Sequence, residues 1–129
     1  MVIKEVQTRI FVAPADFDAA VAQYVALTGG KITLHFTFPE RELQLTTVSS
    51  AYANFLIISG PEDALRIARQ TQLTALVDDI TAVEAHVAAI GAELLQEPTP
   101  VPTGFQARAR HAGGLVIEYV QHTASESNR

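Results

Sequence analysis

The stretch QLTALVDDITAVEAHVAAIGAELLQEP, residues 72–98, contains the pattern that decides the fold. Residues 72–77 have the apolar character of a buried strand. Asp79 is a candidate helix N-cap, because a carboxylate there can accept hydrogen bonds from the unpaired N–H groups of the next turn. Apolar side chains then recur at helical spacing up to Gly91, at Ile80, Val83, Val87 and Ile90. The stretch therefore predicts a strand, an amphipathic helix and, at 92–95, a short second strand.

A similar stretch occurs earlier in the chain. TRIFVAPADFDAAVAQYVALTGG, residues 8–30, also predicts a strand followed by a helix, with Asp16 as the N-cap and Gly29 as the stop. Gln7 aligns with Gln72, 65 positions later. An internal repeat of this size predicts two copies of one structural unit.

The other segments complete each copy to the order β-α-β-β-β, which makes the fold class α+β. The predicted strands lie at 2–12, 31–38, 42–48 and 53–59 in the first copy, and at 72–77, 92–95, 105–111 and 115–121 in the second. The proline-rich segment 97–104 is predicted as a loop and a candidate lid. We expect one domain at 1–122, with repeats at about 3–59 and 71–122, a linker helix at about 61–70 and a flexible tail at 123–129.

The composition narrows the classes of function. The 129 residues carry a net charge of −5, and their nine Lys and Arg residues are scattered, so we expect no nucleic-acid partner. The absence of cysteine excludes disulfides and zinc–thiolate sites. The N-terminal residues MVIKEVQTRI do not resemble a signal peptide, and no run of 18 apolar residues predicts a membrane span. The expected compartment is therefore the cytoplasm, with no membrane partner.

Three stretches in order, at 8–30, 72–98 and 110–121 (RHAGGLVIEYVQ), resemble the vicinal oxygen chelate superfamily. This superfamily includes glyoxalase I, bleomycin-resistance proteins and extradiol dioxygenases. The resemblance covers nearly the whole chain, from about residue 3 to residue 122. It implies two βαβββ repeats that curl into one cup for a small molecule, and a homodimer. It also implies that metal enzymes of this type carry His on the first strand of each repeat and Glu or His on the last.

The sequence departs from that metal-binding pattern. The two first-strand positions hold Gln7 and Gln72, and the last strand of the first repeat, 53–59, has neither carboxylate nor imidazole. Only Glu118, on the final strand, is a strong ligand. Because transition ions prefer imidazole, carboxylate or thiolate over amide oxygen, we expect no catalytic metal and no other cofactor.

The same positions supply the candidate ligand-binding residues. Glu118 is a candidate catalytic base or ligand anchor, or else a remnant paired with a nearby arginine. Gln7 and Gln72 are expected to bond a ligand, or each other. Arg9 shares a strand face with Gln7, and it either pairs with Glu118 or binds an anionic group. The aromatic candidates for the wall of the cup, which otherwise belong to the core, are Phe11, Phe36, Tyr52, Phe55 and Phe105.

Other charged side chains are weaker candidates. Arg108 and Arg110 share a face of one strand, where they either steer an anion or form a solvated edge. The four histidines are expected to be solvated or hydrogen-bonded rather than metal ligands, and they are His35, His86, His111 and His122.

Three functions follow from these alternatives. The first is a metal-free protein, like the bleomycin-resistance branch, that binds a small aromatic or amphipathic molecule in the cup between the repeats. The second is a lyase, isomerase or dioxygenase of the same superfamily that uses a rebuilt metal site or Glu118 as general base. The third is a scaffold or regulatory subunit with a vestigial pocket. Because one fold hosts many chemistries, the resemblance constrains architecture more than reaction.

Overall fold

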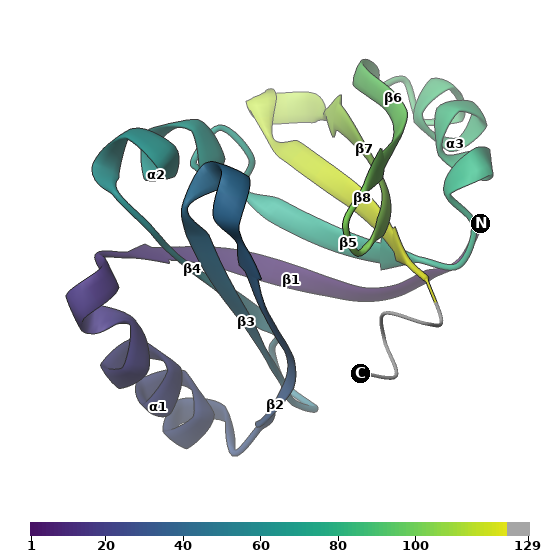
Figure 1. The fold of residues 1–129 in the computed structure, drawn as a ribbon. Helices are drawn as coiled ribbons and strands as arrows, with labels where there is room; N and C mark the ends of the chain where they lie inside the picture. The colour runs from purple at the N-terminus through teal and green to yellow at the C-terminus, as the bar shows by residue number, and fades with distance from the viewer. Residues whose placement is uncertain (124–129) are drawn as a thin grey trace. The chain divides into compact units, whose positions relative to one another are not determined.

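A computed structural model describes residues 1–123, so all of the predicted tail at 123–129 except Thr123 lies outside the described residues. The chain divides into two compact units. We call Gln7–Gln70 the first half. The second half begins at Thr71 and also includes Met1–Val6. The colour gradient of Figure 1 follows the chain through both halves.

The first half is a four-stranded sheet with a helix on one face. Its strands have the order β2-β3-β4-β1, in which β1 and β4 run parallel and the other neighbours antiparallel. Its elements are β1 (Ile3–Val12), α1 (Phe17–Thr28), β2 (Lys31–Phe38), β3 (Leu43–Ser49), β4 (Phe55–Ser59) and a further helix α2 (Glu62–Ala68).

The second half repeats this arrangement. Its strands have the order β5-β8-β7-β6, again with one parallel pair, β5 and β8, and antiparallel neighbours elsewhere. Its elements are β5 (Leu73–Val77), α3 (Val83–Ala89), β6 (Glu93–Val101), β7 (Gly104–Arg110) and β8 (Val116–His122). The predicted α+β class and the two βαβββ repeats are therefore confirmed.

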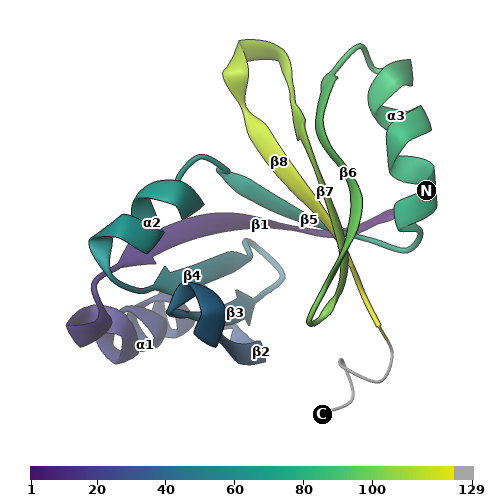
Figure 2. The same ribbon diagram turned by 45° about the horizontal axis from the view of Figure 1, so that its top comes forward.

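Each repeat buries the apolar face of its helix against its own sheet. Phe17 and Val21 of α1 pack on Val48 and Ile57. In the second half, Val83 and Val87 of α3 pack on a surface that consists of Ala75, Ala107, Ala109 and Tyr119. Figure 2 shows α3 beside the strands of the second half. Complete burial of Ile57 and Val83 places these contacts at the centre of the two cores.

The proline-rich segment is the main correction to the predicted elements. Residues 97–104 are not a loop or a lid, because β6 continues through Pro98 and Pro100 to Val101. Proline has no N–H to donate, so it is tolerated on the outer side of an edge strand. β6 is such a strand, since it pairs with β7 and ends the strand order of its half.

The two predicted helix caps have different outcomes. Asp79 accepts from Thr81 N at 3.1 Å and from Thr81 Oγ1 at 2.6 Å, which confirms its role. Asp16 makes no capping hydrogen bond, so that prediction is wrong. A 3₁₀ turn, Pro14–Asp16, runs directly into α1, and Asp16 is therefore already in a helical conformation. Asp16 is not the first residue of the helical segment, because the 3₁₀ turn already begins at Pro14.

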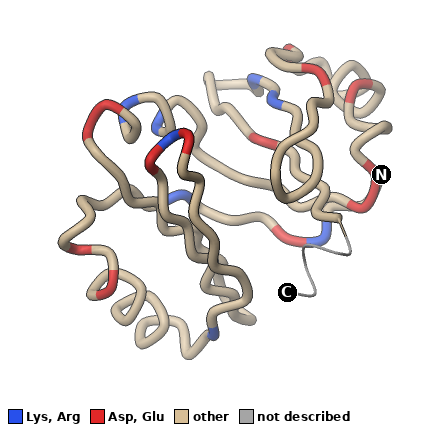
Figure 3. The backbone as a smooth tube through the Cα atoms, viewed as in Figure 1, with Lys and Arg blue, Asp and Glu red and all other residues tan. Residues whose placement is uncertain are grey.

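Within residues 1–123, no helix is long and apolar enough to cross a membrane. Figure 3 shows that the positions of Lys and Arg along the backbone are spread over several elements.

Candidate functional site

The strand registers place four polar residues side by side in the second half. Thr74 of β5 aligns with Glu118 of β8, Glu118 with Arg108 of β7, and Arg108 with Gln96 of β6. We call these four residues the polar row. Residues that alternate with them in sequence, such as Ala75, pack against α3. Because successive side chains of a strand point to opposite faces, the polar row lies on the face away from α3.

The polar row is partly removed from water. Thr74 is buried, and Glu118, Arg108 and Gln96 are half-buried. Arg108 Nε donates to Gln96 Oε1 at 3.1 Å. Arg110, two residues further along β7, instead forms an exposed ion pair with Glu93 at 2.9 Å. The two arginines that the sequence grouped together therefore have different environments.

The equivalent row of the first half is less polar. Arg9 aligns with Leu56, Leu56 with Thr47, and Thr47 with Leu34. Leu56 thus occupies the position that Glu118 has in the second half, as expected for a strand without a carboxylate. Thr47 is buried, and its hydroxyl has no hydrogen-bond partner among the described residues. An unpaired buried hydroxyl lowers the stability of the folded state by roughly 1–3 kcal/mol.

The two glutamines that replace the metal-site histidines lie in different surroundings. Gln7 is buried within β1. Gln72 lies just before β5. Its side-chain Oε1 accepts from Val116 N at 2.8 Å, and its backbone N–H donates to the Val116 carbonyl. The carbonyl oxygen that would bind a metal or ligand is therefore already used to hold the start of β8.

The predicted aromatic residues are divided among several surfaces. Phe11 and Phe36 pack with Leu45, Leu56 and Ile58 on the face of the first half away from α1. We call these five residues the apolar face.

The other three aromatic residues lie elsewhere. Phe55 belongs to the α1 core, with its ring 4.7 Å from that of Tyr24. Tyr52 is 89% exposed, and Phe105 is 39% exposed on β7, on the same side as Ala107. Ligand contacts of these three residues remain predictions.

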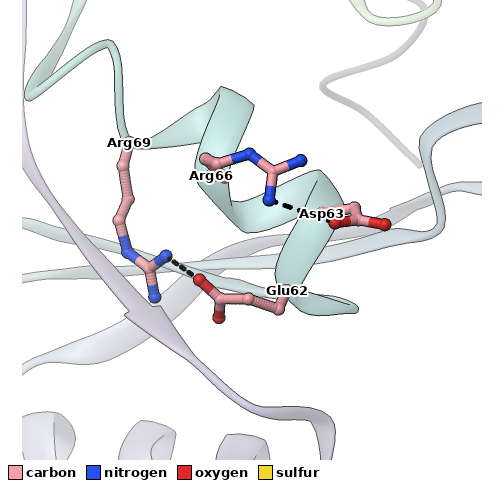
Figure 4. Close-up of polar contacts among 4 residues, drawn as sticks. All are labelled: Glu62, Asp63, Arg66 and Arg69. Carbon is pink, nitrogen blue, oxygen red and sulfur yellow. Dashed lines mark hydrogen bonds and ion pairs between the residues drawn. The ribbon is translucent and has the colours of Figure 1, made fainter.

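Arg9, another arginine that the sequence predicted for the site, is hydrogen-bonded to α2. Arg9 Nη1 donates to the Ala68 carbonyl at 3.2 Å, at the C-terminal end of this helix. The Cζ atom of Arg69 lies 5.7 Å from the centroid of the Phe11 ring, and Arg69 also forms an ion pair with Glu62. Figure 4 shows this pair beside the exposed Arg66–Asp63 pair. These contacts give the arginines at α2 a structural role in fixing the helix.

The side chains present do not fit a transition-metal site. Within residues 1–123, no group of three or more His, Cys, Asp or Glu residues is placed to hold a metal ion. The candidate ligands that remain are the amides of Gln7 and Gln72 and the carboxylate of Glu118. Amide oxygen is a poor ligand for Zn²⁺, Ni²⁺ or Fe²⁺, and the Gln72 oxygen is also engaged by Val116.

Sequence analysis missed a buried network behind the polar row. Tyr119 is almost fully buried, and its hydroxyl and His111 Nε2 are hydrogen-bonded at 2.7 Å. The His86 ring meets the Tyr119 ring edge-on at 5.9 Å. Desolvation raises the pKa of Tyr119, so the phenol stays protonated. In the sequence, Tyr119 directly follows Glu118 on a predicted strand, and this alternation places the two side chains on opposite faces of the sheet.

Burial also affects the last histidine of the chain. Desolvation lowers the pKa of His122 from its ordinary value of 6.5, although a hydrogen bond to the Thr103 backbone and the charge of Glu118 act in the opposite direction. His122 and Glu118 share a face of β8, since they are four residues apart. The surroundings of His122, on the same face of β8 as Glu118 of the polar row, therefore favour a neutral imidazole.

Comparisons with known proteins give a consistent result for the fold. No family model and no curated protein matches the chain. An uncharacterised protein from Methanosarcina mazei has a TM-score of 0.79 and 35% identity, over 95% of both chains. Methylmalonyl-CoA epimerase from Mycobacterium tuberculosis has a TM-score of 0.68 and 17% identity, over 98% of this chain and 93% of that one.

A third solved structure is methylmalonyl-CoA epimerase from Streptomyces coelicolor in complex with 2-nitronate-propionyl-CoA. It has a TM-score of 0.60 and 19% identity, over 95% of this chain and 97% of that one. At these identities the epimerases show the fold alone. The chain therefore belongs to the same family as the uncharacterised Methanosarcina mazei protein, and its fold is that of the vicinal oxygen chelate superfamily.

Proposed function

We propose that this protein binds a small aromatic or amphipathic molecule, and that it does so without a transition metal. The observation that carries the proposal is the polar row, Thr74, Glu118, Arg108 and Gln96, on the face of the second half away from α3. The row brings together two opposite charges, an amide and a hydroxyl, and all four side chains are at least half-buried. Their presence on one sheet face is typical of a site that is retained for binding.

The first half supports the apolar part of this proposal. On its apolar face, Phe11 and Phe36 are half-buried, and the three aliphatic side chains are buried in one cluster with Leu65 of α2. The Thr47 hydroxyl, which lies in the same strand pair as Leu56, is a donor without a partner among the described residues. An apolar surface of this kind favours contact with the apolar part of an amphipathic molecule.

Donor chemistry supports the metal-free part. One carboxylate and two amides lack the charge and softness that hold a transition ion or activate a bound water. Leu56, at the position equivalent to Glu118, cannot contribute a ligand. Binding would then depend on hydrogen bonds, one or more ion pairs and apolar contact.

The test combines metal analysis with ligand binding. Elemental analysis of the purified protein should show no stoichiometric metal, and EDTA should leave the melting temperature unchanged. A thermal-shift screen with flat aromatic compounds that carry one polar group should give stabilising hits. Replacing Glu118 by Gln should weaken these hits, while replacing the exposed Glu84 on α3 by Gln should not.

Two results would contradict the proposal. Stoichiometric zinc, nickel or iron that EDTA removes with a loss of stability would show that the donor argument is wrong. Identical melting shifts for the wild type and the Glu118→Gln variant would remove the polar row from the binding site.

A further inference from the structure

Arg108 differs from the other arginines of the described residues that form ion pairs. Arg66, Arg69 and Arg110 each pair with a carboxylate, and all three are exposed residues. Arg108 is half-buried, and its contact is with the neutral amide of Gln96. Within the described chain, no carboxylate oxygen lies within 4.0 Å of its guanidinium. A partly desolvated cation without a close counter-ion is unfavourable unless an anion binds to it.

Gln96 also sets the direction of the guanidinium. Its Oε1 accepts from Arg108 Nε, at 3.1 Å, rather than from a terminal nitrogen. With Nε held from β6, the two terminal nitrogens keep their donors for another partner. A guanidinium presents such donors as a planar fork that matches the two oxygens of a carboxylate. Gln96 is therefore a positioning residue for Arg108.

The surroundings select the charge of the anion. Glu118 is the cross-strand neighbour of Arg108 on β8. Its carboxylate offsets part of the attraction between Arg108 and any anion, so a second negative charge on a ligand adds little net attraction. The other neighbours in the row, Thr74 and Gln96, are neutral. A singly charged carboxylate, whose two oxygens match the guanidinium fork, is therefore the simplest anion that fits this site.

We propose that the ligand carries a carboxylate and that the Arg108 guanidinium binds it. This inference rests on the proposed function, because it names the polar group of the small molecule that the protein binds. It assigns Arg108 as the residue that selects acids over neutral analogues, with Gln96 as its support.

The experiment compares acids with their own primary amides. Benzoate, phenylacetate and 2-naphthoate are titrated into protein labelled with ¹⁵N, and benzamide, phenylacetamide and 2-naphthamide are titrated in parallel. The signals followed are backbone amides of β7 and β8 and the arginine Nε–H groups. In the wild type, at least one acid should bind about tenfold or more tightly than its amide, as a charged hydrogen bond predicts, and it should shift the Arg108 Nε–H signal.

Three variants separate the contributions. Arg108→Gln should abolish the preference for the acid. Gln96→Glu keeps Arg108 but gives it a fixed counter-ion, so it should reduce the preference to a similar extent. Arg110→Gln is the matched control, because this arginine is on the same strand and already pairs with Glu93, and it should leave the preference unchanged. Circular dichroism confirms that each variant is folded.

The outcomes distinguish this inference from the proposed function. Equal binding of acids and amides to the wild type, or an acid preference that survives in both Arg108→Gln and Gln96→Glu, would overturn the role of Arg108 and leave small-molecule binding intact. No binding of any acid or amide would overturn both proposals.

Discussion

Gln72 combines a side-chain and a backbone interaction with one partner, Val116. Its amide oxygen accepts from Val116 N, and its backbone N–H donates to the Val116 carbonyl. The sequence placed Gln72 in the binding site because it aligns with Gln7, but alignment gives a position on a strand and not the direction of a side chain. The structure shows that Gln72 extends the pairing of β5 and β8 by one residue.

Replacing Gln72 by Leu should therefore lower the free energy of unfolding by about 1 kcal/mol, because the buried Val116 N–H loses its acceptor. Urea denaturation measures this change. Gln72→Glu is the control, since its carboxylate retains an acceptor at the same place. An unchanged unfolding free energy for Gln72→Leu would mean that water replaces the amide without cost.

His122 predicts a dependence of stability on pH. Its pKa is lowered in the folded state, chiefly by desolvation, so below pH 6.5 the unfolded chain binds a proton that the folded chain does not. Stability should therefore fall as the pH is lowered from about 6.5 towards the pKa of the folded state, by at most about 1.4 kcal/mol per pH unit for one proton. Above pH 6.5 both states are neutral at this position, and the effect vanishes.

The measurement is thermal or urea unfolding of the wild type and His122→Gln between pH 7.5 and pH 5. The variant should lose less stability over this range. Charges near His122 are those of Glu118, Lys4 and Glu5, and they are retained in the variant. Parallel pH profiles for the two proteins would show that His122 does not titrate differently in the folded and unfolded states.

At the scale of elements, β6 explains why prolines misled the prediction. Proline is a strong signal for loops, and three of them occur between Gln96 and Thr103. The signal fails here because a strand at the edge of a sheet does not need the N–H groups on its outer side. Edge position is a property of the tertiary fold, so no local pattern reveals it. By contrast, the helical spacing of Val83 and Val87 was sufficient to predict α3, since both side chains pack into the core.

The prolines of β6 should also protect this edge against pairing with another chain. Replacing both Pro98 and Pro100 by Thr restores two N–H groups on the outer side of β6. At about 1 kcal/mol for each new hydrogen bond, self-association should rise roughly tenfold or more. Sedimentation velocity over a range of protein concentrations measures it.

The control for this experiment is Pro102→Thr, which changes a proline in the turn between β6 and β7 and should leave self-association at the level of the wild type. If the double variant associates no more than this control, Pro98 and Pro100 do not prevent β6 from pairing with a strand of another chain.

At the scale of the whole molecule, the repeat gave the most information about the fold. The offset between Gln7 and Gln72 predicted two copies of one unit, and the two halves do share their strand order. The candidate site was harder to predict, because the features that distinguish it arise from neighbours across strands. The pairing of Arg108 with Gln96 and the missing partner of Thr47 depend on registers between β3, β4, β6, β7 and β8. Sequence analysis identified Arg108 as a candidate, but it did not distinguish Arg108 from Arg110.

The continuous strand β1 belongs to both units, since Met1–Val6 groups with the second half and the rest with the first. The Val2 N–H donates to the Asp78 carboxylate, and the Val2 carbonyl accepts from the Asp78 backbone N–H. Cutting the gene at Thr71 would thus produce a C-terminal fragment that lacks a segment of its own folding unit. Anyone who duplicates, permutes or transplants the second repeat must transfer the six N-terminal residues with it.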